Sequence, residues 1–85
     1  MDPRDQAARA LTELKSAIIA FLRLRPGGAG NSEIARELGL ESDFHGKQKN
    51  YLSWSVIGLL VNDGILSATH KGRRVTYSIR EKNRE

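Results

Sequence analysis

The stretch from Lys47 to Leu66, KQKNYLSWSVIGLLVNDGIL, limits the possible folds more than any other part of the chain. Helical spacing places four of its apolar residues on one stripe, which we expect to pack on a small core. These residues are Leu52, Val56, Leu59 and Leu60. The segment Asn62-Asp63-Gly64 predicts the end of the helix, because glycine easily adopts the left-handed conformation that closes helices. Apolar Ile65-Leu66 follows at once, so the pattern predicts a helix, a glycine stop and then a strand.

The opposite face of this expected helix mixes a cation, an amide and two aromatic rings, which is not the composition of an ordinary solvated face. It carries Lys47, Asn50, Tyr51, Trp54 and Gly58. In this register Asn50 and Trp54 point most clearly outward. A tryptophan is costly to leave in water, so two interpretations of Trp54 stay open. Either its ring folds down onto the 41–46 loop or the C-terminal hairpin, or it offers apolar surface to a partner.

The composition excludes several classes of protein. A chain of 85 residues forms one domain, and its 39% hydrophobic and 28% charged residues are typical of a globular fold. It has no cysteine and only two histidines, His45 and His70, so we expect no metal site. We also expect no cofactor and no small-molecule site. No apolar run reaches membrane-spanning length and MDPRDQ lacks the apolar core of a signal peptide, so we expect a cytoplasmic protein without a membrane partner.

Positive charge is concentrated in the second half of the chain. The formal net charge is +4, and residues 47–80 hold six Lys or Arg against Asp63 alone. Residues 1–40, in contrast, hold six Lys or Arg against five Asp or Glu. A basic half suits a polyanionic partner such as nucleic acid, although small soluble proteins are also often mildly basic.

The remaining patterns predict two more helices and one hairpin. A long helix is expected from Asp2-Pro3 to about Leu24, followed by a turn over 25–30 with a very short strand near Ala29. A second helix is expected from Ser32 to Leu38, capped by Asn31 and ended by Gly39, and a loop over 41–46 follows it. The hairpin is expected to consist of strands from Ile65 to His70 and from Arg74 to Arg80, joined by a Lys71-Gly72-Arg73 turn. The other residues that we expect to be buried are Leu14, Ile18, Phe21, Ile34, Leu38, Leu66, Val75, Tyr77 and Ile79. In a helix-turn-helix the second helix of the pair enters the major groove of DNA, so this element order favours DNA binding.

The chain from Asn31 to Ile79 resembles a winged helix-turn-helix domain. The residues that carry the resemblance are Glu33-Ile34-Ala35, Leu38-Gly39-Leu40, Val56, Leu59, Gly64-Ile65-Leu66, Gly72-Arg73-Arg74, Tyr77 and Ile79. The resemblance implies a mainly α fold with a small β-hairpin (α+β), one domain over residues 1–80 and a polar tail over 81–85. Residues 48–66 are similar in particular to winged-helix modules attached to prokaryotic restriction endonucleases, including Mrr-type and modification-dependent enzymes. The loop before the third helix is longer than in compact members.

The resemblance implies a protein that binds double-stranded DNA, as the targeting domain of a restriction-type system or as a transcription regulator. Its third helix would read the major groove while the basic hairpin holds the phosphate backbone. The expected phosphate contacts are Lys47, Lys49, Lys71, Arg73, Arg74 and Arg80, and the expected residues near base edges are Gln48, Asn50, Tyr51, Ser53, Trp54 and Ser55. This helix has no arginine, the usual bidentate partner of guanine.

Other functions remain open at this stage. Winged helices also serve as protein-interaction adaptors, in which case Tyr51 and Trp54 would anchor a partner. RNA binding would call for aromatic residues on a sheet, which the pattern does not offer. The clustered carboxylates and lysine of a nuclease are missing, so we do not expect an enzyme. The apolar stripe of the first helix is no wider than one core requires, which favours a monomer over a weak homodimer.

Overall fold

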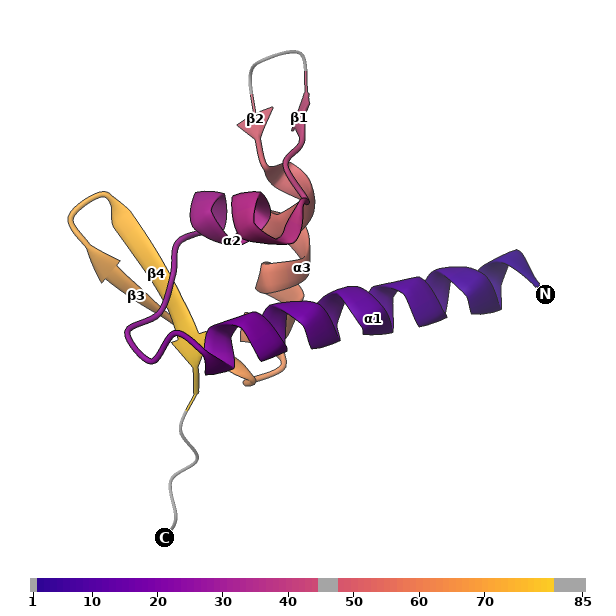
Figure 1. Cartoon of the computed structure of the whole chain (residues 1–85), viewed down its shortest axis with the longest axis horizontal. Coiled ribbons are helices and arrows are strands. Elements are labelled where there is room, and N and C mark those ends of the chain that lie inside the picture. The colour runs from indigo at the N-terminus through magenta and orange to yellow at the C-terminus, as the bar shows by residue number, and fades with distance from the viewer. Residues whose placement is uncertain (1, 45–47, 81–85) are drawn as a thin grey trace, which may run out of the picture.

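The computed structural model describes residues 2–44 and 48–80 of the chain. These residues form three helices and two small antiparallel sheets of two strands each (Figure 1). The elements are α1 (Pro3–Arg23), α2 (Asn31–Leu38), β1 (Asp43–Phe44), β2 (Gln48–Lys49), α3 (Tyr51–Asn62), β3 (Leu66–Lys71) and β4 (Arg74–Ile79). The expected combination of helices with a C-terminal hairpin is confirmed. Within the described ranges, no helix combines the length and the apolarity that crossing a membrane requires.

Helix α1 begins as its sequence predicts, with Asp2 as N-cap and Pro3 at the first helical position. Ile18 and Leu22, in its C-terminal half, are fully or almost fully buried. Its N-terminal half extends beyond the other elements, and residues 2–10 are all exposed (Figure 1). Helix α1 therefore contributes to the core from Leu11 onward.

The α1–α2 connection reaches across to β4. Gly28 has a φ of 86°, and the next residue, Ala29, forms an isolated antiparallel bridge with Tyr77. The two residues exchange backbone hydrogen bonds of 2.9 Å in each direction. This bridge is the very short strand expected near Ala29, and it joins the first part of the chain to the last strand.

Helix α3 is shorter than expected and turned differently on the core. It begins at Tyr51, because Gln48 and Lys49, which were expected in the helix, form β2 and pair with β1. Strand β1 lies in the segment that was expected to be a loop. Its buried residues are Ser53, Val56, Ile57 and Leu60. The expected burial of Leu52 and Leu59 is wrong, since they are 39% and 42% exposed. The physical reason is that α3 is apolar on almost every side, so the spacing of apolar residues alone does not identify its buried face. Ser53 can be buried because its hydroxyl group is hydrogen-bonded.

The core lies where α1, α2, α3 and the hairpin meet. Its buried cluster is Ile18, Leu22, Ala29, Ile34, Val56, Ile57, Leu60 and Leu66. Of the other residues expected inside, Leu14, Phe21, Leu38, Val75, Tyr77 and Ile79 are only partly buried. Small domains bury a limited part of their surface, so a half-buried second layer is the ordinary outcome.

The β3–β4 hairpin follows the glycine stop of α3. Gly64 adopts a φ of 77°, and the Ile65 amide donates to the Leu60 carbonyl at 3.0 Å, which closes the helix as predicted. Strands β3 and β4 pair from Leu66 with Ile79 to Lys71 with Arg74. The first strand thus begins one residue later than expected and ends at Lys71. Residues 71–74 form the tip of the hairpin, hereafter the basic turn.

Candidate nucleic-acid interface

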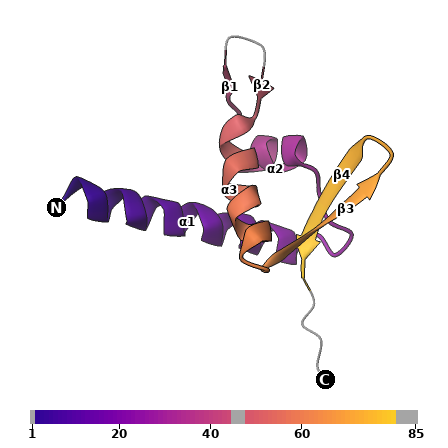
Figure 2. The same cartoon turned by 180° about the vertical axis from the view of Figure 1, so that it is seen from behind.

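Helix α3 presents an uncharged surface to solvent, hereafter the α3 face. Its members are Tyr51, Trp54, Ser55 and Gly58, all of which are exposed. Figure 2 shows the ribbon of α3 in front of that of α2. The outward direction predicted for Tyr51 and Trp54 is confirmed, with 41% and 61% of their surface exposed. Between Tyr51 and Asn62 the helix contains no charged residue.

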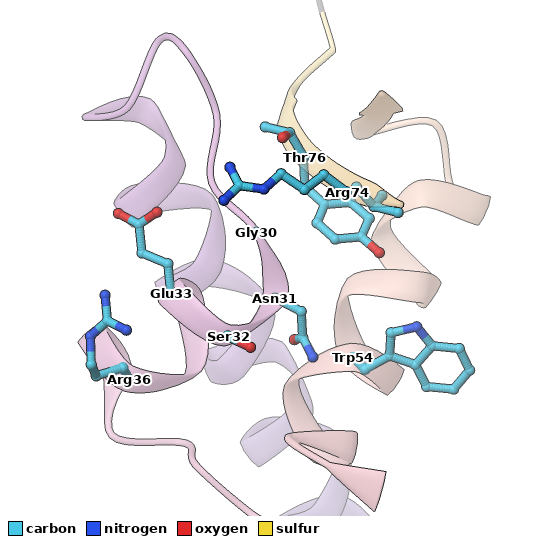
Figure 3. Close-up of a pocket in the computed structure, with 10 residues that line it drawn as sticks. Gly30, Asn31, Ser32, Glu33, Arg36, Trp54, Arg74 and Thr76 are labelled. Atoms are coloured by element: carbon cyan, nitrogen blue, oxygen red, sulfur yellow. The ribbon is translucent and has the colours of Figure 1, made fainter. Parts of the chain in front are cut away.

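Trp54 stands where three shallow grooves adjoin. The first groove lies between the start of α2 and β4, where Asn31 and Arg74 line it (Figure 3). The second lies between α3 and the β3–β4 hairpin and holds about 590 Å³. The third is lined by Asn31, Lys49, Tyr51 and Trp54. The indole points away from the ribbon of α3 in Figure 3 and Trp54 is 61% exposed, so the hairpin does not cover its ring. The alternative in which it folds onto the 41–46 loop involves positions 45 and 46, which lie outside the described residues.

Exposed cations border the α3 face on two sides. Lys71, Arg73 and Arg74 occupy the basic turn, and Lys49 ends β2 beside the start of α3. Arg74 lines one groove with Trp54, and Lys49 lines another. None of these four cations forms an ion pair with another residue in the described part of the chain. The positive charges are therefore available to an anionic partner.

Several residues predicted at the interface lie elsewhere. Lys47 lies outside the described residues. Gln48 and Lys49 belong to β2 and not to the helix. Asn50 and Ser53 are not directed at a partner, since both are engaged inside the protein. The apolar pattern predicted an outward direction for these side chains because the helix was expected to begin four residues before its observed start and because its buried face was assigned incorrectly.

A polar network joins the starts of α2 and α3. The Asn31 side-chain amide donates to the Asn50 carbonyl at 3.0 Å, and the fully buried Ser53 hydroxyl donates to Asn31 Oδ1 at 2.5 Å. Asn31 was expected to be the N-cap of α2, but it is the first residue of the helix, and Gly30 is the N-cap. Buried polar groups need hydrogen-bond partners, so this network fixes the distance and rotation between α2 and α3.

Asn50 extends the same network to the segment before β1. Its φ of 59° lies in the left-handed region, which asparagine tolerates better than most residues. Its Oδ1 accepts from the Ser42 amide at 3.3 Å, its Nδ2 donates to the Ser32 hydroxyl at 3.5 Å, and its own amide donates to the Ser42 carbonyl. The Ser42 hydroxyl in turn accepts from the Leu52 amide at 3.2 Å. Asn50 therefore positions the first turn of α3.

Among residues 2–44 and 48–80, no group of three or more His, Cys, Asp or Glu side chains is placed to hold a metal ion. Comparison of the chain with protein-family models, with curated proteins and with solved structures gave no match.

Proposed function

We propose that this chain is a winged-helix module that binds double-stranded DNA. In the proposal, α3 enters the major groove and the basic turn holds phosphates beside it. The observation that carries the proposal is the uncharged, exposed α3 face bordered by cations that form no ion pair with any described residue. Cations hold phosphates without regard to sequence, and an uncharged helix face can contact base edges through hydrogen bonds and apolar groups, so this division of charge suits a duplex.

The arrangement of the elements supports the same proposal. The major groove is about 12 Å wide and admits one α-helix. Apart from the short β1–β2 hairpin between α2 and α3, the order α1, the Ala29 bridge, α2, α3, β3 and β4 is the one expected of a winged helix-turn-helix. The Asn31–Asn50–Ser53 network holds α2 against the start of α3, as a bracing helix must hold a reading helix.

In this proposal the chain supplies targeting and no catalysis, as in a restriction-type system or a transcription regulator. A second function is favoured by one observation, the exposure of apolar Leu52 and Leu59 near the α3 face. An adaptor would bury these side chains and Trp54 against a protein partner. Such binding would depend weakly on salt, whereas DNA binding depends on it strongly.

The test is a titration of a fluorescent duplex of mixed sequence at several salt concentrations. Replacing both Arg73 and Arg74 by alanine should weaken binding to every sequence and lower the slope of log K against log[salt] by about 0.9 for each phosphate that the variant no longer neutralises. The matched control replaces Arg4 and Arg9, two exposed arginines on the part of α1 that extends away from the hairpin. Equal effects in both double variants, or affinity that does not change with salt, would contradict the proposal.

A further inference from the structure

We infer that the α3 face reads the C5-methyl group of pyrimidines in the major groove, with Trp54 as the residue in contact with the methyl. The inference rests on the proposed DNA binding and names the feature of the duplex that the site recognises. The methyl is that of thymine or of 5-methylcytosine. Both sources offer the same apolar group at the same place on the base.

The first argument is what the α3 face lacks. Purines are read chiefly by arginine or lysine on guanine and by asparagine or glutamine on adenine. Helix α3 has no charged residue and no glutamine, and its single asparagine, Asn62, is its last residue. The amide of Asn50, one residue before the helix, is occupied by Ser42 and Ser32. The first two turns of α3 therefore offer no bidentate partner for a purine.

The second argument is what the face offers in its place. Trp54 leaves 61% of its surface exposed although the neighbouring grooves have room for a ring. The buried core cluster does not include it, so the fold gives no reason for an aromatic residue at this position. A pyrimidine C5-methyl is the apolar group that base pairs project into the major groove, and apolar side chains are its usual contacts.

Gly58 supplies a third argument, because it lies one helical turn after Trp54 on the same face. A Cβ added there would meet no atom within 4 Å, so packing inside the protein does not require glycine. Glycine inside a helix is unfavourable relative to alanine. The missing side chain leaves space beside the indole, where the edge of a base can approach the helix backbone.

The cations around the face identify the partner as nucleic acid and not an apolar protein surface. Lys49 and Arg74 each share a groove with Trp54. A protein that covered Trp54 would also have to neutralise these charges. Phosphates flank every major groove, so a duplex meets both requirements at once.

The experiment compares three duplexes of one sequence, titrated with the full chain at fixed salt. One is unmodified, one carries uracil in place of every thymine, and one carries 5-methylcytosine in place of every cytosine. A buried methyl contributes about fourfold in affinity, so we expect a loss of about fourfold per contacted thymine on the uracil duplex or a matching gain on the methylcytosine duplex. A change in one arm alone identifies the source of the methyl. The chain has one tryptophan, so its emission reports the contact directly.

Variants then assign the effect to Trp54. Trp54→Ala should abolish the difference between the duplexes but retain the salt dependence supplied by the basic turn, and Trp54→Phe should keep part of the difference. The control is Leu24→Ala, which removes a side chain that is 75% exposed at the end of α1. Equal binding of all three duplexes by the unaltered chain would overturn the inference and leave the proposed DNA binding intact. Failure to bind any duplex would overturn both.

Discussion

Asn50 is the residue on which the orientation of α3 depends most directly. Its backbone is in the left-handed region, and its side chain joins the segment before β1 to the start of α2. Asn50→Ala should lower the free energy of unfolding by about 2–3 kcal/mol, from the backbone strain and the missing hydrogen bonds together. Asn50→Gly removes the same bonds without the strain and should lower it by only about 1 kcal/mol.

Urea unfolding at 25 °C measures both Asn50 variants. Equal losses of stability for alanine and glycine would show that backbone strain is unimportant at this position. If DNA binding depends on the start of α3, the alanine variant should also bind duplex more weakly at a temperature where it remains folded.

Two glycines should respond to alanine with opposite signs. An added Cβ at Gly28 would lie 2.7 Å from the Tyr77 carbonyl oxygen, at a φ of 86°, and should lower stability by about 1–3 kcal/mol. At Gly58 the Cβ meets nothing, and Gly58→Ala should raise stability by about 1 kcal/mol through helix propensity. Thermal unfolding followed by circular dichroism tests both. A destabilised Gly58→Ala would show a packing role that the structure does not contain.

At the residue scale, the features that could be predicted from the sequence are those that depend on neighbouring residues. The left-handed glycine stop at Gly64 and the outward Trp54 depend on neighbours within one helical turn. The roles of Asn31 and Ser53 depend on each other across 22 positions of sequence. No local pattern contains that information, although an asparagine and a serine beside helix starts are the residue types that form such bonds.

At the scale of elements, the two sides of α3 differ in how much stability they contribute. Ile57 is fully buried, so Ile57→Ala should cost about 2–5 kcal/mol. Leu59 is 42% exposed, and Leu59→Ala should cost only about 1 kcal/mol. Denaturant unfolding of the two variants, with unchanged m-values, checks this order. A larger loss of stability for Leu59→Ala than for Ile57→Ala would indicate that Leu59 is buried, as the sequence predicted, and would contradict the observed orientation of α3.

The boundaries of elements were predictable where apolar period and turn chemistry agree. The apolar period and the turn residues agree for α1 and for the β3–β4 hairpin, and the bounds of these elements differ from expectation by about one residue. Neither holds for β1 and β2, because a strand of two residues is too short to show alternation. Helix α3 was expected to begin four residues too early, and its buried face was assigned incorrectly because a helix that is apolar on nearly every side shows little amphipathic contrast.

For the whole molecule, we predict a monomer. The exposed start of α1 is the part that would be free to pair with a copy of itself, but residues 2–10 carry one proline, alanines and charged or polar side chains, with no large apolar residue. A stable interface usually buries about 800 Å² on each partner, with apolar residues at its centre. Sedimentation equilibrium at micromolar concentration should give the monomer mass of 9.5 kDa. A dimer mass at this concentration would overturn this prediction.

The Ala29–Tyr77 bridge also governs the order in which the protein can form during synthesis. A ribosome releases α1 and α2 first, yet Ala29 finds its partner only after β4 has emerged. Closing so long a loop costs entropy before the contacts within it compensate, so the helices should stay loosely associated until the last strand docks. The α1–α2 connection is then fixed against β4 in one late step, and in a nascent chain without Tyr77 it should remain undocked.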